Sequence, residues 1–255
     1  MVPDPVTGLR IRHVIREDAL GEFLRAEDPQ TGEPVCLRRL HAHLAEDDTA
    51  RLLFLEELRR ISTLSHPGLV RVRRSDRNAP RPWAVTDPID DGTLEEEFLS
   101  TGPWAREPAR KFVVELLSAL EQLESRHQFH AALLPSRLVR VRGTFRLTTF
   151  REIRADDEAP RLKGRDPVDP RFAAPELDAD DASPVKARPL TAFAVGALWR
   201  WLRIGKAPND GAIPGVEDAD GAWIERLLEG EPMLRPAGAD SLRRLLVAEG
   251  GGPRG

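Results

Sequence analysis

The decisive stretch of this sequence reads HAALLPSRLVRVRGTFRLTTF and spans residues 130–150. Its pattern predicts the exit from a helical region, a tight loop and a β-hairpin with Arg142 and Gly143 at the turn. The stretch contains neither Asp nor Glu. Any interpretation of the chain must therefore explain why a well-formed loop and hairpin contain no carboxylate at all.

The composition excludes several classes of protein. The 255 residues carry a net charge of -4 with 31% charged residues, so neither nucleic acid nor a membrane is an expected partner. The single cysteine, Cys36, excludes an internal disulfide. The start of the chain lacks a signal-peptide pattern, and the most apolar stretch, residues 190–202, is shorter than the roughly 20 residues that span a bilayer. We expect a cytoplasmic protein.

The first part of the chain, residues 9–87, is predicted to form short strands with one helix among them. Alternating apolar residues begin at Leu9, and turn-forming residues separate the later strand-like runs. Apolar residues recur at helical spacing from about Asp48, and either Asp47 or Asp48 can cap this helix. Glu57 falls on the inward face of the helix and needs a cation nearby, because an unpaired buried charge is costly.

Residues 88–247 are predicted to form a larger, mainly helical part. An amphipathic helix over residues 106–128 precedes the loop and the hairpin. A segment that is apolar nearly all round, residues 190–203, is expected to be a helix inside the domain. Two more helices follow it. The ends, residues 1–8 and 248–255, are expected to be flexible tails.

Several segments follow one another in the order of a known family. They are similar to the V-A-I-K strand, helix C, hinge, catalytic loop, D-F-G strand, A-P-E motif and closing R-P helix of protein kinases. The chain thus resembles the protein kinase superfamily, in particular bacterial kinases of the eukaryotic Ser/Thr type. The matching segments are TGEPVCLRRL, FLEELRRISTLSHPGLV, WAVTDPIDDGTLEEEF, SRHQFHAALLPSRLV, FRLTTFR, FAAPEL and EPMLRPAGADSLRRLL.

The resemblance implies an α+β, protein-kinase-like bilobal fold. The N-lobe, residues 9–87, is expected to be a small five-stranded antiparallel sheet with one main helix. The C-lobe, residues 88–247, is expected to be larger and mainly helical.

The nucleotide-binding positions of the family are replaced in this chain. Arg16 and Asp18 stand at the first two glycines of the Gly-rich loop, and only Gly21 is kept. Phe23 stands where the family has a valine over the adenine, so its ring is expected to fill the space of a base. Arg38 stands at the strand lysine and will not serve a phosphate as lysine does. We therefore expect no bound nucleotide cofactor.

The catalytic positions are replaced as well. His130 of the H-R-D motif is kept, but Ala131 and Ala132 stand for its Arg and its proton-accepting Asp. Arg137 matches the Asn that holds magnesium, and Thr149 matches the Asp of D-F-G. The joint loss removes positioning and electrostatic stabilisation together. The resemblance thus predicts a pseudokinase that is not an enzyme and binds no metal.

The remaining matches imply structural roles. Arg38 and Glu57 are expected to clamp the strand to the helix, and Glu176 and Arg235 to form the buried ion pair of the family. Thr191 replaces the Asp that anchors the catalytic loop in kinases. The family comparison also implies an inner stack of Ile61, Val72, His130 and Phe150.

The function expected from this pattern is binding of another protein. The chain would act as a scaffold or as an allosteric regulator of a partner, such as an active kinase or a signalling protein. Residues 151–176, which match the loop that carries the activating phosphosite in kinases, contain no Ser, Thr or Tyr. Phosphorylation within that loop is therefore excluded as a switch.

Two alternatives stay open beside this interpretation. An unconventional nucleotide-dependent transferase would need acidic metal ligands, and an anion or nucleic-acid binder would use the Arg-rich hairpin, although no aromatic platform is interleaved with its arginines. Nucleotide binding without metal, through Arg38 and Arg137, is a variant of the main interpretation. The candidate acids are Asp18, Asp87, Asp90 and Asp91. The candidate arginines are Arg137, Arg140, Arg142, Arg146 and Arg151.

Overall fold

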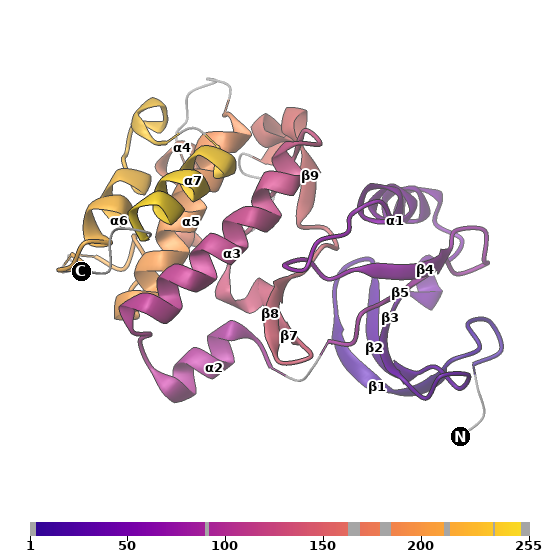
Figure 1. Cartoon of the computed structure of the whole chain (residues 1–255). Coiled ribbons are helices and arrows are strands. Elements are labelled where there is room, and N and C mark those ends of the chain that lie inside the picture. Colours follow the sequence, from indigo (N-terminus) through magenta and orange to yellow (C-terminus); the bar gives the residue numbers. More distant parts are fainter. Residues whose placement is uncertain are drawn as a thin grey trace. The chain divides into compact units, whose positions relative to one another are not determined.

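The computed structural model describes residues 4–89, 92–162, 169–178, 185–211, 215–236 and 238–250. The chain forms two compact units, and most of their helices and strands are labelled in Figure 1. The first unit consists of Met1–Gly92 together with Val139–Arg151. The second consists of Thr93–Leu138 together with Glu152–Gly255.

A five-stranded antiparallel sheet in the order β1-β2-β3-β5-β4 forms the framework of the first unit. β2 and β3 pair without interruption from Gly21 opposite Leu40 to Glu27 opposite Pro34. Apolar side chains of these strands and of β5 form a buried cluster. The strands are β1 (Arg10–Glu17), β2 (Gly21–Glu27), β3 (Pro34–Leu40), β4 (Val72–Asp76) and β5 (Trp83–Thr86).

The helix of the first unit is α1 (Asp48–Ile61), which follows the short 3-10 turn η1 (Ala42–Leu44). Asp47 is the residue that caps it, since its Oδ1 accepts a hydrogen bond of 2.9 Å from Ala50 N. The helix buries one face and leaves charged side chains on the other. Its buried residues are Ala50, Phe54, Glu57, Leu58 and Ile61.

The hairpin of β7 (Leu138–Val141) and β8 (Thr144–Leu147) belongs to the first unit except for its first residue, Leu138. Arg142 and Gly143 both have positive φ angles, 51° and 83°, which suits a two-residue hairpin turn. Leu147 forms a parallel bridge with Leu69, a residue of the first unit. This pairing explains why Val139–Arg151 belongs to that unit although it lies in the middle of the chain.

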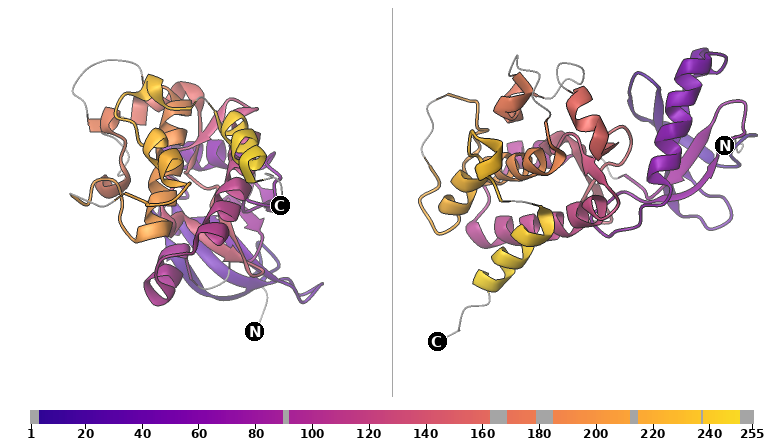
Figure 2. Two further views of the ribbon diagram at one scale, coloured as in Figure 1. Left: turned by 60° about the vertical axis from the view of Figure 1, so that its left-hand side comes forward. Right: turned by 90° about the horizontal axis from the view of Figure 1, so that it is seen from above.

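The second unit is mainly helical, and α3 packs beside α5 and α7 in all views (Figures 1 and 2). The helix α2 begins with a capping box in which Thr93 and Glu96 exchange side-chain and backbone hydrogen bonds. A two-stranded ladder pairs β6 with β9, His130 lying opposite Ile153. The regular elements are α2 (Leu94–Thr101), α3 (Arg106–Glu124), β6 (Gln128–His130), β9 (Ile153–Ala155), α4 (Pro175–Asp178), α5 (Ala187–Ile204), α6 (Gly221–Leu227) and α7 (Ala239–Gly250). The 3-10 turns are η2 (Pro135–Arg137), η3 (Asp156–Leu162), η4 (Pro170–Phe172) and η5 (Pro232–Leu234).

The expected fold class is confirmed by these elements, which combine a five-stranded antiparallel sheet and one main helix with a mainly helical second unit. The apolar helix expected over residues 190–203 is α5, most of which is buried. Residues 4–8, expected in a flexible tail, form a turn that Asp4 ties to Arg39 at 3.0 Å. Over the described part of the chain, we find no helix with both the length and the apolar character needed to span a bilayer.

Candidate functional site

The position of the kinase lysine is occupied by Arg38, whose side chain has 0% exposure on strand β3. Its Nη2 donates a hydrogen bond of 3.0 Å to Asp18 Oδ1, in the turn between β1 and β2. Its Nε lies 3.5 Å from Glu57 Oε1 on α1. The guanidinium therefore joins three elements of the first unit, and the pair expected between strand and helix has a second carboxylate beside it.

Three phenylalanine rings enclose this guanidinium. Arg38 Cζ lies 4.4 Å from the centre of the Phe23 ring, 5.1 Å from Phe54 and 5.7 Å from Phe150. Phe23 and Phe150 pack edge to face, with ring centres 5.5 Å apart. We call Arg38, Asp18, Glu57 and these three rings the Arg38 cluster. Because the Arg38 side chain has no exposed surface, its N–H groups are not accessible to a phosphate.

Strand pairing explains why the cluster forms. Phe23 on β2 lies directly opposite Arg38 on β3, so the ring and the guanidinium are cross-strand neighbours. Packing requires glycine at position 21, the glycine kept from the Gly-rich loop, because a Cβ there would lie 2.2 Å from Arg39 O. Asp18 Oδ1 also accepts hydrogen bonds from the backbone N–H groups of Leu20 and Gly21. The replaced loop is thus an internally bonded turn.

The Arg38 cluster favours the charged form of the Asp18 carboxyl group. Its burial raises the pKa of the carboxyl, but the nearby Arg38 guanidinium and the hydrogen bonds from Leu20 and Gly21 outweigh burial, so the pKa lies below its usual value. The carboxylate already serves Arg38 and the turn. It is therefore poorly placed to act as a metal ligand in addition.

The loop that matches the catalytic loop lies in the second unit and is built on β6. His130 is buried, and its Nδ1 accepts a long hydrogen bond of 3.4 Å from Ala132 N. Ala131 N donates to Glu152 O at 2.6 Å, which fixes the loop against the start of β9. The side chains at the two positions after the histidine are methyl groups, which neither accept a proton nor bind a cation.

Arg137, at the position of the magnesium-holding Asn, has an acidic partner in the same unit. Its Nη1 lies 3.1 Å from Glu152 Oε1, a carboxylate whose side chain is only 6% exposed. This guanidinium supplies the positive charge that Glu152 needs, so this carboxylate is already paired and is a poor ligand for a divalent cation.

The position of the D-F-G acid is also occupied by a group with another partner. Thr149 is buried in the first unit, and its Oγ1 donates a hydrogen bond of 3.2 Å to Val70 O. Arg151 follows with a positive φ of 61° at the place of the family's glycine. The residues at the two metal-ligand positions therefore do not fit Mg²⁺, because one is a cation and the other hydroxyl is hydrogen-bonded to the backbone.

Other predicted structural residues are placed as follows. Glu176 and Arg235 form a two-pronged ion pair of 2.6 and 2.8 Å in the second unit. Thr191 Oγ1 bonds to Ala187 O within its own helix, α5. Ile61 and Phe150 are buried in the first unit, where Val72 lies on β4, and His130 is buried in the second. The proposed stack of these four residues stays a prediction.

The arginines of the hairpin have acidic or aromatic neighbours. Arg142 Nη2 lies 3.5 Å from Glu33 Oε1, and Arg146 Nη1 lies 2.8 Å from Asp87 Oδ2. Arg140 stacks over the Phe145 ring at 4.6 Å. Asp87 also pairs with Arg73, while Asp90 and Asp91 lie outside the described residues. Arg142 and Arg146, which an anion-binding face would need, are thus paired with carboxylates, and Asp87, which an alternative metal site would need, is paired with arginines.

Among the described residues, His, Cys, Asp and Glu side chains form no group of three or more that could hold a metal ion. Two of the carboxylates described above, Asp18 in the first unit and Glu152 in the second, are each paired with an arginine. These ion pairs hold buried charges in place within each unit, so the residues that form them have a structural role.

Comparison with known proteins identifies the superfamily. No family model matches the chain. The chain is 25% identical over 205 residues to the probable serine/threonine-protein kinase PknB of Lactococcus lactis, a match covering 79% of this chain and 32% of that protein. It is 26% identical over 186 residues to the serine/threonine-protein kinase AfsK of Streptomyces griseus, covering 72% and 23%. These matches support membership of the protein kinase superfamily.

A plant relative of this kinase-like domain, CBL-interacting protein kinase 32 of Oryza sativa, is 25% identical over 129 residues, or 49% of the chain and 28% of that protein. The matched part spans about a third or less of each of these relatives. The superfamily recognised from the motifs is thus confirmed. The likeness concerns one kinase-like domain in longer proteins.

The expectation that the chain is not an enzyme is wrong by this comparison, because its relatives are named as Ser/Thr protein kinases, which points to enzyme activity. The physical reason is that position-by-position matching tests one mechanism only. Proton transfer and charge stabilisation can come from other groups that reach a reacting centre.

Two charged groups of this kinase-like domain were missed from the sequence. Glu152 lies three residues beyond Thr149 and matches no motif, and only the pairing of β6 with β9 brings it beside the loop of His130. Asp220 is fully buried and pairs with Arg106 and Arg110 of α3. Arg110 on the buried face of α3 is a sequence signal for such an acid, because a buried cation needs a partner.

Proposed function

We propose that this kinase-like domain acts by binding another protein, as a scaffold or an allosteric regulator of a signalling partner. We also propose that it does not take Mg-ATP in the manner of active kinases. A transferase activity, to which the relatives point, is compatible with partner binding and would use groups outside the standard set. We place the protein in the cytoplasm, in keeping with its free, buried Cys36.

The enclosure of Arg38 is the observation that carries the proposal. In the family the matching lysine must present a cation to phosphate, whereas Arg38 has no exposed side-chain surface and is occupied by Asp18. Phe23 and Phe150 cover it with aromatic carbon. Opening this cluster for a nucleotide would separate a buried cation from its partners, which is costly.

Thermal unfolding with nucleotide tests the Mg-ATP part of the proposal. A ligand at a hundredfold excess over its Kd stabilises by about 2.7 kcal/mol, and for a chain of this size each kcal/mol raises the midpoint by about 2–4 °C. We expect a shift of less than about 1 °C with Mg-ATP, ATP with EDTA, or Mg²⁺ alone. An active Ser/Thr kinase serves as the positive control.

Each nucleotide condition has a distinct meaning. A shift of several degrees with Mg-ATP that EDTA abolishes would refute the proposal. A shift that survives EDTA would indicate nucleotide binding without metal, through arginines. Transfer of radiolabel from ATP onto a set of generic proteins would show a transferase that uses a non-standard site.

Affinity purification from the native host tests the partner. We expect a saturable complex with a defined protein, kept after washing at moderate salt. Recovery of the chain alone from native cells, at a concentration where it is folded and monomeric, would count against a scaffold or regulatory role.

A further inference from the structure

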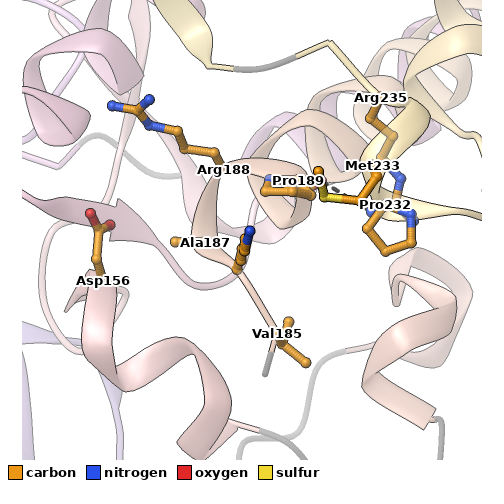
Figure 3. A pocket seen from close by; sticks show the side chains of 9 residues that line it. Asp156, Val185, Ala187, Arg188, Pro189, Pro232, Met233 and Arg235 are labelled. Carbon is orange, nitrogen blue, oxygen red and sulfur yellow. Dashed lines mark hydrogen bonds between the residues drawn. The ribbon is translucent and has the colours of Figure 1, made fainter. Parts of the chain in front are cut away.

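A pocket of about 440 Å³ lies within the second unit, between the start of α5, the turn η5 and Asp156 (Figure 3). This volume falls in the range of pockets that hold ligands or peptide side chains. The charged positions that match the kinase catalytic loop are not among its lining residues. No role assigned above to the second unit uses this space.

The walls of the pocket are largely apolar. Val185, just before α5, and Pro189, in its first turn, line the pocket on one side, and Pro232 and Met233 line it from η5. Asp156 and Met233 lie on opposite sides of the space in Figure 3. Met233 is 69% exposed and its neighbour Leu234 is 62% exposed, so apolar surface continues from the pocket onto the outside of the unit.

Two exposed basic residues, Lys186 and Arg188, line the same pocket. Among the described residues Lys186 forms no ion pair, while Arg188 lies near enough to Glu124 to favour the charged form of that partly buried carboxyl. Arg235 also lines the pocket, but Glu176 neutralises it. Of the described lining residues, Lys186 and, beside it, Arg188 are therefore the cations that an incoming ligand can meet.

We propose that an acidic segment of the partner protein binds in this pocket. This inference rests on the partner binding proposed above. The segment presents an apolar side chain, which fills the space between Val185, Pro189 and Met233. Asp or Glu residues flanking it pair with Lys186 and Arg188. Apart from Arg235, which Glu176 neutralises, the described lining has two cations and one carboxylate, that of Asp156, so its charge favours an acidic segment over a basic one.

Fluorescence polarisation with the full chain tests the docking. One labelled pool of twelve-residue peptides carries a central Leu or Phe flanked by Asp and Glu, with the other positions randomised. A second pool replaces the acids with Lys, and a third replaces the central residue with Ser. We expect saturable binding of the acidic apolar pool only, weakened by salt.

Substitutions locate the binding on the chain. Lys186→Glu and Met233→Asp are each expected to reduce the affinity for the acidic apolar pool at least tenfold. Lys111→Glu reverses an exposed positive charge on α3, and Leu99→Asp replaces an exposed apolar residue of α2 in the same unit. Both controls are expected to bind as the unaltered chain does.

The proposal is overturned if no pool binds, if the basic pool binds better, or if Lys186→Glu and Met233→Asp bind the acidic pool normally. These results differ from failure of partner binding as a whole. A native partner that is retained by Lys186→Glu and Met233→Asp leaves the scaffold function standing and removes only the docking site.

Discussion

Replacing Arg38 by Met would test whether the Arg38 cluster holds the first unit together. The substitution keeps an apolar side chain of similar length but leaves the Glu57 carboxylate, 7% exposed, without its guanidinium. Breaking a buried ion pair by removing one partner costs about 3–5 kcal/mol. Lost contacts with the three rings, about 0.5–2 kcal/mol each, are offset in part by sulfur–aromatic contacts of Met. We expect Arg38→Met to lower the free energy of unfolding by about 3–5 kcal/mol.

The double variant Arg38→Met, Glu57→Leu separates the cost of the unpaired Glu57 charge from the cost of the lost contacts with the three rings. With both charges removed, the interior contains apolar side chains of similar size, and such replacements are often neutral or stabilising. We therefore expect the double variant to recover most of the stability lost in Arg38→Met. Asp18 then faces water, which its 27% exposed side chain permits.

Urea unfolding, followed by tryptophan fluorescence, measures these changes. Hydrogen exchange then shows whether protection is lost in β3 and α1, as local weakening of the first unit requires. Two results would refute the reasoning. One is a cost below about 1 kcal/mol for Arg38→Met, which is too small for a broken buried pair. The other is a double variant that is less stable than Arg38→Met.

Three further changes probe the same region. Gly21→Ala should lower stability by about 1–3 kcal/mol, because its Cβ would lie 2.2 Å from Arg39 O, while Gly230→Ala, with nothing within 4 Å, should be nearly neutral in the same urea titration. Arg151→Gly should raise the unfolding midpoint by relieving a φ of 61°, worth about 1 kcal/mol, whereas Arg151→Ala keeps the strain; equal midpoints would contradict this. Burial raises the pKa of the Cys36 thiol to about 11, so native protein should react with Ellman's reagent at pH 8 far more slowly than protein in guanidinium. Because the unfolded thiol ionises near pH 9.0 and the folded one does not, stability should fall as the pH rises from 9 to 11, and Cys36→Ala should remove that loss.

Much of the candidate site could be predicted because its residues obey local rules. Glu57 was placed on the buried face of α1 by spacing alone, and the requirement for a cation followed from the cost of burying a charge. Arg38 was named as that cation by the family match. The contact of Asp18 with Arg38 was not foreseen, because it depends on the shape of the turn between β1 and β2.

The sequence by itself determined the order of strands and helices and the absence of standard acids at the catalytic positions. The first follows from residue type and spacing, which act over a few residues, and the second from the resemblance of the motifs to those of protein kinases. Only the tertiary structure decided which charges neutralise one another, such as Arg137 with Glu152 and Arg146 with Asp87. Ion pairs depend on distances of a few ångströms between residues far apart in the chain, and strand pairing sets those distances.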